Sequence, residues 1–138
     1  MRVLALDIGE VRCGIAVSDP AMRVASPLAV LPMQDVLQAA KPFRQLLDEW
    51  EPEMLVCGLP YTLAGEEGPQ AERIRKAAAA IGAASDLPVV FTDERLSSRH
   101  AKHILREEGL NEKQMRGKID MVAASLFLQA WLDERTEA

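Results

Sequence analysis

The sequence lacks most of the features that mark secreted or membrane proteins. It has two cysteines in 138 residues, too few for a disulfide framework, and both Cys13 and Cys57 lie in apolar runs, where a reduced thiol behaves as a small hydrophobic group. It has no apolar run long enough to cross a bilayer and no basic leader typical of a signal peptide. These absences predict a soluble cytoplasmic protein with no membrane partner.

The sequence is also poor in positive charge and in aromatic residues. Its 16 Lys and Arg against 21 Asp and Glu give a formal net charge of −5, and 4% of its residues are aromatic. This composition argues against nucleic-acid binding through the whole surface or through extensive base stacking. A protein that gathers acids around divalent cations can still hold nucleic acid on a local basic patch, by its backbone and shape.

The sequence does contain enough apolar material for one core. Hydrophobic residues make up 49% of it, and no repeat, low-complexity tract or linker interrupts the chain. We therefore expect a single domain over residues 1–138.

Apolar runs and turn residues predict five strands and four helices. Gly9 to Gly14 supply the turn of a first hairpin, while Pro42 and Pro69 are typical of helix starts. Three antiparallel strands followed by two parallel ones predict an α/β fold, with a mixed five-stranded sheet and helices on both faces. The predicted strands cover residues 3–6, 15–17, 26–31, 54–57 and 88–91, and the predicted helices cover residues 35–50, 70–83, 97–109 and 118–134.

Asp7 ends the most hydrophobic of these predicted strands. An ionised carboxylate there has a large desolvation cost unless a cation or hydrogen-bond donors compensate for it. Two interpretations stay open. Asp7 either binds a cation, or it caps the turn from Gly9 to Gly14 by accepting backbone N–H bonds.

Asp120 shares one predicted helix face with Ala124, Phe127 and Trp131, and this face should press on the sheet. The small neighbour Ala123 would let the helix approach closely. The alternative is an acid that only complements the positive end of the helix dipole.

Asp93 and Glu94 follow the last predicted strand, in the position equivalent to Asp7 if both strands run parallel in the sheet centre. Adjacent residues of an extended segment point to opposite faces, so only one of the two is expected to face the site. The alternative is an exposed turn acid paired with Arg95.

Three acids that can meet at one edge of a sheet predict a hard-oxygen site for Mg²⁺ or Mn²⁺. Two such cations about 3.5–4 Å apart can activate a water and stabilise the leaving oxygen in phosphodiester cleavage. His100 and His103 lie on a predicted surface helix and either face the substrate or are solvated, with the solvated interpretation favoured, so the metal is expected to carry the chemistry.

Four motifs in this order resemble those of the YqgF (RuvX) family and span nearly the whole chain. They are DIGEVRCGIAVSD at residues 7–19, GLP at residues 58–60 with Gly65 and Gly68-Pro69, DERLSS at residues 93–98, and Asp120 before Ala123-Ala124 and Leu128-Gln129.

This resemblance implies an RNase H-like fold, kinship with Holliday-junction resolvases and processing of the 5′ end of precursor 16S ribosomal RNA. It also implies that Asp7, Glu94 and Asp120 are the catalytic metal ligands. Arg12 and Arg95 occupy motif positions that could contact phosphate. Two departures are Cys13 in place of an aliphatic residue and Val11, where many members carry a basic residue; the lost charge would weaken substrate binding.

A basic lining is expected close to the acids. Arg116 and Lys118 precede Asp120 directly and so belong near any site that Asp120 joins, as nucleic-acid-binding residues. The charges from Arg95 to Arg106 are equally typical of a solvated helix face. The loop at residues 58–68 is expected to border the site, with Tyr61 as its candidate substrate contact.

Three other functions compete with a ribosomal RNA nuclease. An Asp-x-Gly hairpin also resembles the phosphate loop of the actin, Hsp70 and sugar-kinase group, but those proteins enclose ATP between two domains. A noncatalytic ribosome-assembly factor would keep the same acids. A Holliday-junction resolvase acting on branched DNA would need two sites in a symmetric homodimer, for which the sequence offers no decisive surface.

Overall fold

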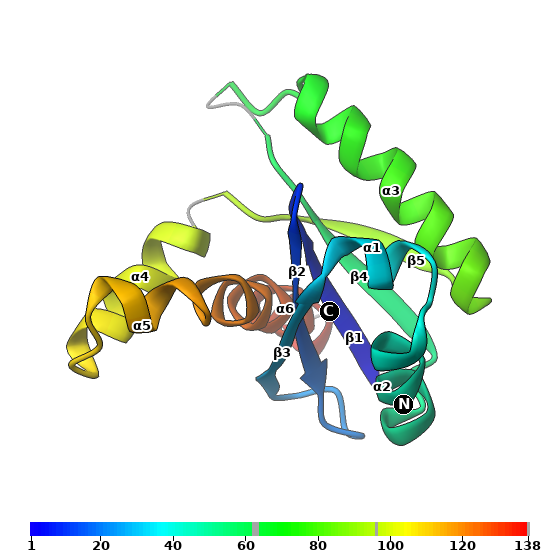
Figure 1. Cartoon of the computed structure of the whole chain (residues 1–138), viewed down its shortest axis with the longest axis horizontal. Helices are drawn as coiled ribbons and strands as arrows, with labels where there is room; N and C mark the ends of the chain where they lie inside the picture. The colour runs from blue at the N-terminus through cyan, green and yellow to red at the C-terminus, as the bar shows by residue number, and fades with distance from the viewer. Residues whose placement is uncertain (62–63, 96, 138) are drawn as a thin grey trace.

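The computed structural model contains one five-stranded sheet in the order β3-β2-β1-β4-β5 and describes residues 1–61, 64–95 and 97–137 (Figure 1). β1 is antiparallel to β2 and parallel to β4, while β2 is antiparallel to β3 and β4 is parallel to β5. The predicted sheet is therefore confirmed. The strands are β1 (Val3–Ile8), β2 (Arg12–Ser18), β3 (Ala25–Pro32), β4 (Met54–Leu59) and β5 (Val89–Asp93).

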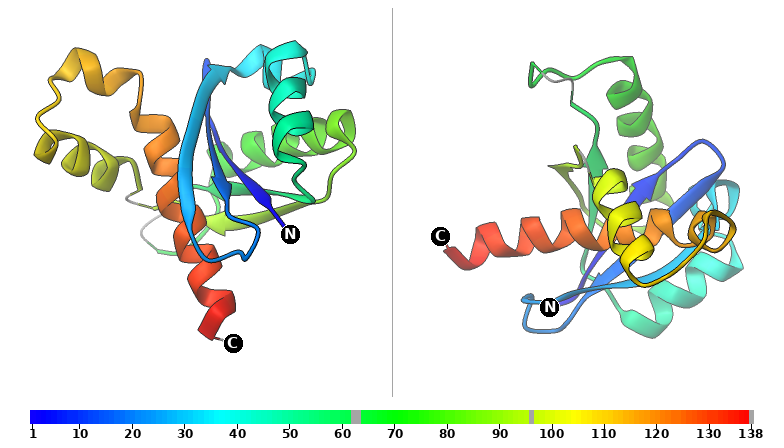
Figure 2. Two further views of the ribbon diagram at one scale, coloured as in Figure 1. Left: turned by 90° about the horizontal axis from the view of Figure 1, so that it is seen from below. Right: turned by 90° about the vertical axis from the view of Figure 1, so that its left-hand side faces the viewer.

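Helices cover both faces of the sheet, as predicted. Figure 2 shows α2 and α3 on one side of the strands and α6 on the other, with α4 and α5 standing beside α6. The helices are α1 (Met33–Leu37), α2 (Lys41–Trp50), α3 (Pro69–Ser85), α4 (Ser97–Glu107), α5 (Glu112–Arg116) and α6 (Ile119–Glu137). None of the helices in the described ranges combines the length and the apolar character needed to cross a membrane.

Alternate residues of β1 enter two separate cores. Leu4 and Leu6 are fully buried with Phe43 of α2, whereas Ala5 is fully buried with Leu128 of α6. This alternation follows from the pleat of a strand covered on both faces. The run that contains Asp7 is thus enclosed on both faces, and its carboxyl end lies at the same edge of the sheet as those of the parallel strands β4 and β5.

Two predicted elements differ from the structure near the edge strand. The helix predicted over residues 35–50 is two helices, because Ala39 takes a left-handed conformation with φ 48° and Pro42 lies in the first turn of α2. The first hairpin turn is shorter than Gly9 to Gly14, since β1 reaches Ile8 and β2 already begins at Arg12.

The segment between β5 and α6 forms a helical arm. Asn111 caps α5 by accepting a hydrogen bond from the Gln114 N–H at 2.9 Å, and the Gln114 side chain accepts one in return from the Asn111 N–H. Met115 is the one buried residue of α5, with 1% of its surface exposed. α5 was not predicted, because five residues are too short to show a helical period.

Candidate active site

The Asp7 side chain faces two other acids, Glu94 and Asp120, and the turn after β1 is closed by a backbone hydrogen bond. Burial, followed by the negative charges of Glu94 and Asp120, raises the pKa of Asp7 from 3.8 to about 8. Its carboxyl group donates a hydrogen bond to the Glu94 carboxylate. The turn closes through its own backbone, because the Gly9 N–H donates to the Arg12 carbonyl oxygen at 3.0 Å.

Glu94 follows β5 directly and is held by its backbone, since its N–H donates to the Leu59 carbonyl oxygen at 3.1 Å. Burial raises the pKa of Glu94. Its side chain lies over Gly58, where an added Cβ would stand 2.6 Å from Glu94 Oε2 and 2.8 Å from Phe127 Cε2. Gly58 therefore provides the space that Glu94 occupies.

Asp93 points away from this pair. Its side chain is 41% exposed and accepts a hydrogen bond from Arg95 Nε at 2.8 Å. The two adjacent acids thus separate as alternation along a strand requires, with Glu94 toward Asp7 and Asp93 toward solvent.

Asp120 reaches the same edge through the close approach of α6 to β2. Gly14 pairs with Asp7 across the sheet, and a Cβ on Gly14 would lie 2.1 Å from the Asp120 carbonyl oxygen. The Asp120 carboxylate forms an ion pair with Arg12, with 3.4 Å between Nε and Oδ2. Gly14 therefore allows the first turn of α6 to rest on the strand pair that carries Asp7.

The donor chemistry at this edge fits a divalent cation. Carboxylate oxygens are the ligands that Mg²⁺ and Mn²⁺ prefer, and a cation can take the place of the proton that Asp7 and Glu94 share. Within the described residues, no three His, Cys, Asp or Glu side chains are already placed to hold a metal ion. In this arrangement Asp7 and Glu94 bond to each other and Asp120 pairs with Arg12.

The four basic residues predicted to bind nucleic acid occupy different surroundings. Arg12 lies at the solvent side of the acid cluster, where it pairs with Asp120. Arg95 pairs with Asp93 at 2.7 Å and lies over the Tyr61 ring at 5.9 Å. Arg116 and Lys118 are exposed on either side of the junction between α5 and α6.

Sequence reasoning missed the two glycines that create the site. Gly14 and Gly58 were treated as parts of motifs, although each lies in a buried strand, where glycine lowers stability unless a neighbour approaches closely. A glycine inside a predicted buried strand is therefore the sequence signal that indicates a close neighbour. The predicted loop at residues 58–68 includes residues 62 and 63, which lie outside the described ranges, while Tyr61 forms an isolated bridge with Glu67.

The raised pKa of Asp7 predicts that the metal-free protein loses stability as pH rises. The folded state holds a proton up to about pH 8, whereas an unfolded Asp releases it near its ordinary 3.8. The favourable contribution is therefore complete below pH 4 and lost toward pH 8. We expect the free energy of unfolding in EDTA to fall by about 4 kcal/mol between pH 5 and pH 8. Urea unfolding of wild type and Asp7→Asn checks this, and equal pH slopes for both would contradict it.

Replacing Gly58 with Ala should displace Glu94. The new Cβ would meet the Glu94 side chain and the Phe127 ring at under 3 Å. We expect a stability loss of about 1–3 kcal/mol and, for an enzyme that uses Glu94, a roughly 10–100-fold slower turnover. Gly117→Ala is the matched control, because a Cβ there meets nothing within 4 Å. If both variants behave like wild type, the space over Gly58 does not position Glu94.

Sequence comparison places this chain among nucleases. The family model "RuvX: Holliday junction resolvase" matches residues 1–134. A relative from Chloroflexus aurantiacus (strain J-10-fl) is 41% identical over 133 residues, which cover 96% of this chain and 87% of the relative. One from Anaeromyxobacter sp. (strain Fw109-5) is 39% identical over 135 residues, which cover 98% of both chains. Each relative carries the name "Putative pre-16S rRNA nuclease".

Solved structures match the fold across the whole chain. RuvC of T. thermophilus, in complex with a Holliday junction substrate, aligns with a TM-score of 0.56 at 15% identity and covers 100% of this chain and 97% of its own. The fowlpox virus resolvase, in complex with Holliday junction DNA, gives a TM-score of 0.57 at 11% identity and covers 98% and 99%. The predicted RNase H-like fold is thereby confirmed.

Proposed function

This chain belongs to the RuvX family, and from that membership we propose that it is a cytoplasmic nuclease that processes the 5′ end of precursor 16S ribosomal RNA, with Mg²⁺ or Mn²⁺ held by Asp7, Glu94 and Asp120. The name shared by the relatives supports the substrate. The observation that carries the proposal is the meeting of three acids from distant parts of the chain at one sheet edge, where two of them share a proton.

Each side chain has a distinct part in this site. Asp7 is fixed by the central strand, so its carboxylate would anchor the metal, while the longer Glu94 side chain can adjust above Gly58. Asp120 would complete the ligand set once it leaves Arg12. The bound metal would activate a water and stabilise the leaving oxygen of a phosphodiester.

Arg12 links ligand placement to substrate binding. Its side chain is 54% exposed and pairs with Asp120 at 3.4 Å, so a phosphate can compete for the guanidinium. We infer that phosphate contact with Arg12 releases Asp120 toward the metal. Arg95, Arg116 and Lys118 would bind phosphates farther from the reacting bond.

Cleavage assays test the proposal directly. Labelled precursor 16S rRNA fragments, single-stranded RNA, single-stranded DNA and a four-way DNA junction are incubated with wild type and with Asp120→Asn, with Mg²⁺ or Mn²⁺ and with EDTA. We expect metal-dependent cutting of the ribosomal precursor by wild type alone. No cutting of any substrate by folded, metal-binding protein would instead favour a noncatalytic assembly factor.

Junction resolution is the second candidate, favoured by the description of the family model. Resolution of a four-way junction requires two sites in a symmetric dimer. Preferential cutting of the junction, together with a dimer in light scattering at assay concentration, would replace ribosomal RNA processing with this function.

A further inference from the structure

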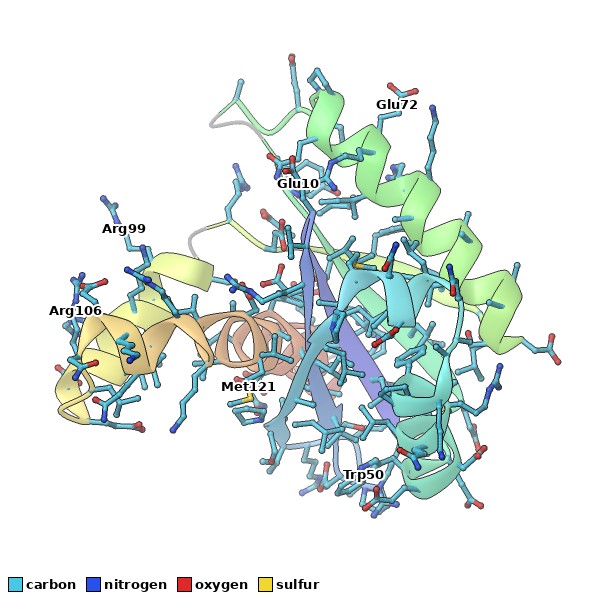
Figure 3. The ribbon with its side chains drawn as sticks, in the orientation of Figure 1. Glu10, Trp50, Glu72, Arg99, Arg106 and Met121 are labelled. Carbon is cyan, nitrogen blue, oxygen red and sulfur yellow. The ribbon has the colours of Figure 1, made fainter. Side chains whose placement is uncertain are left out.

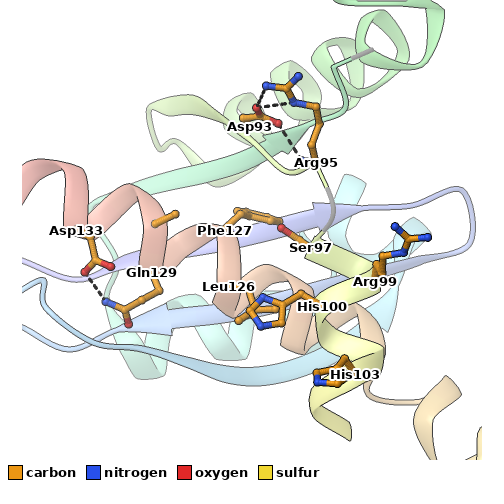
Figure 4. Close-up of a pocket in the computed structure, with 11 residues that line it drawn as sticks. Asp93, Arg95, Ser97, Arg99, His100, His103, Leu126, Phe127, Gln129 and Asp133 are labelled. Carbon is orange, nitrogen blue, oxygen red and sulfur yellow. Dashed lines mark hydrogen bonds and ion pairs between the residues drawn. The ribbon is translucent and has the colours of Figure 1, made fainter. Parts of the chain in front are cut away.

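A cleft of about 820 Å³ lies between α4, α6 and the end of β5, beside the candidate active site (Figure 4). Its floor comes from Leu126, Phe127 and Ala130 of α6, and one wall comes from Arg99, His100 and His103 of α4. The volume falls within the range of roughly 300–1,000 Å³ that is typical of ligand sites. Neither the metal site nor the family comparison assigns this cleft a ligand.

The cleft adjoins the acid cluster across the Phe127 ring. Phe127 lines the cleft, and its Cε2 atom and Glu94 Oε2 both lie within 3 Å of the place where a Cβ on Gly58 would stand. Asp93 and Arg95, the immediate neighbours of Glu94, line the cleft as well. A polymer whose scissile phosphate is held by a cation at these acids would have this cleft beside it, next to Asp93 and Arg95.

The charge around the cleft is uneven and favours a polyanion on the arm side. Residues 97–118 carry six Lys and Arg against three Glu, a net charge of +3 in a chain of net charge −5. Arg99 and Arg106 project from this arm (Figure 3), and Arg99 lies at the rim of the cleft. The acids on the other side are engaged, since Asp93 pairs with Arg95 at 2.7 Å and Asp133 accepts a hydrogen bond from Gln129 at 2.9 Å.

From this arrangement we propose that the cleft binds an unpaired nucleic-acid strand next to the bond to be cut, with its phosphates along α4 and its bases on α6. Leu126 and the exposed Ala130 offer an apolar floor to base faces, and Arg99 offers a cation to the backbone. The Asp133 carboxylate can accept hydrogen bonds from base amino groups. The bases of a duplex are enclosed by stacking and cannot reach such a floor. The inference rests on the proposed nuclease function and adds a preference for single strands.

Fluorescence anisotropy in EDTA tests the cleft apart from catalysis. The probes are a labelled 12-nucleotide RNA, the DNA of the same sequence, and the blunt duplex of each. We expect the unpaired strands to bind at least tenfold more tightly than the duplexes, and the tighter of RNA and DNA identifies the natural strand. Equal or tighter binding of the duplexes would overturn the proposal.

Two pairs of variants localise the strand. Arg99→Ala should weaken single-strand binding about 3–10-fold and lower the slope of log K against log salt by about 0.7, as expected for one lost phosphate contact. Lys102→Ala removes the same charge from α4 outside the cleft and should change affinity less than twofold. Ala130→Glu should weaken binding at least tenfold, whereas Ala79→Glu on the opposite face of the sheet should not.

The outcomes separate this inference from the nuclease proposal. If Arg99→Ala weakens binding no more than Lys102→Ala, and Ala130→Glu no more than Ala79→Glu, the cleft is not the strand-binding site, whatever the cleavage assays show. The opposite case is that binding is lost selectively in Arg99→Ala and Ala130→Glu while the wild-type protein cuts nothing with Mg²⁺ or Mn²⁺. That result would support strand binding in the cleft and contradict the proposed nuclease activity.

Discussion

Asp7→Asn is expected to abolish cleavage and at the same time to stabilise the metal-free protein. The amide cannot replace the anionic ligand, so turnover should fall by about 10³-fold, or roughly 4 kcal/mol of activation free energy. The same change removes the burial cost and the repulsion that raise the pKa of Asp7 to about 8. The free energy of unfolding at pH 8 in EDTA should therefore rise by about 4 kcal/mol.

The test is whether Asp7→Asn lowers the cleavage rate while it raises the free energy of unfolding. General damage to the fold would lower both quantities. Asp48→Asn makes the same chemical change on the exposed side of α2 and should leave both quantities near wild type. Mg²⁺ should raise the melting temperature of wild type and have little effect on Asp7→Asn. A variant that cuts at the wild-type rate would remove Asp7 from the proposed metal site.

Gly14→Ala is expected to be more damaging than a methyl group added at Gly58 or Gly117. The new Cβ would stand 2.1 Å from the carbonyl oxygen and 2.2 Å from the carbonyl carbon of Asp120. Both are backbone atoms, so the first turn of α6 must move off β2. We expect a loss of about 3 kcal/mol in the free energy of unfolding and a roughly 100-fold drop in turnover, since Asp120 moves with its helix.

Urea unfolding and the cleavage assay measure both effects. Gly117→Ala serves again as the control and should stay within about 0.5 kcal/mol of wild type. Gly58→Ala should lie between the two, because its closest contacts are side-chain atoms that can move. Wild-type stability in Gly14→Ala would mean that α6 does not press on β2 at this position.

The order of the strands and the meeting of the acids could be predicted because they depend on simple patterns. Continuous apolar runs marked the buried strands, and Asp7 stood out as a charge at the end of the most apolar one. The parallel arrangement of β1, β4 and β5 then brought their carboxyl ends together. Each of these steps uses only chain order and the period of a strand.

The side-chain arrangement of the site could not be predicted, because it depends on contacts between distant residues. The pair between Arg12 and Asp120 joins residues at opposite ends of the chain, so no local pattern encodes it. The break between α1 and α2 depends on the conformation of Ala39, a residue with no unusual propensity for it. The contact of Gly14 with α6 is equally nonlocal and requires the packed helix.

The chain order of the three acids also determines when the site can form during folding. Asp7 lies in the first strand, Glu94 follows the last strand, and Asp120 lies in the first turn of the last helix, which buries Ala124 and Leu128 against the completed sheet. An intermediate with a formed sheet but an undocked α6 holds at most two of the acids. With the proposed metal site, nuclease activity would require a docked α6, and detachment of this helix would switch it off while the sheet persists.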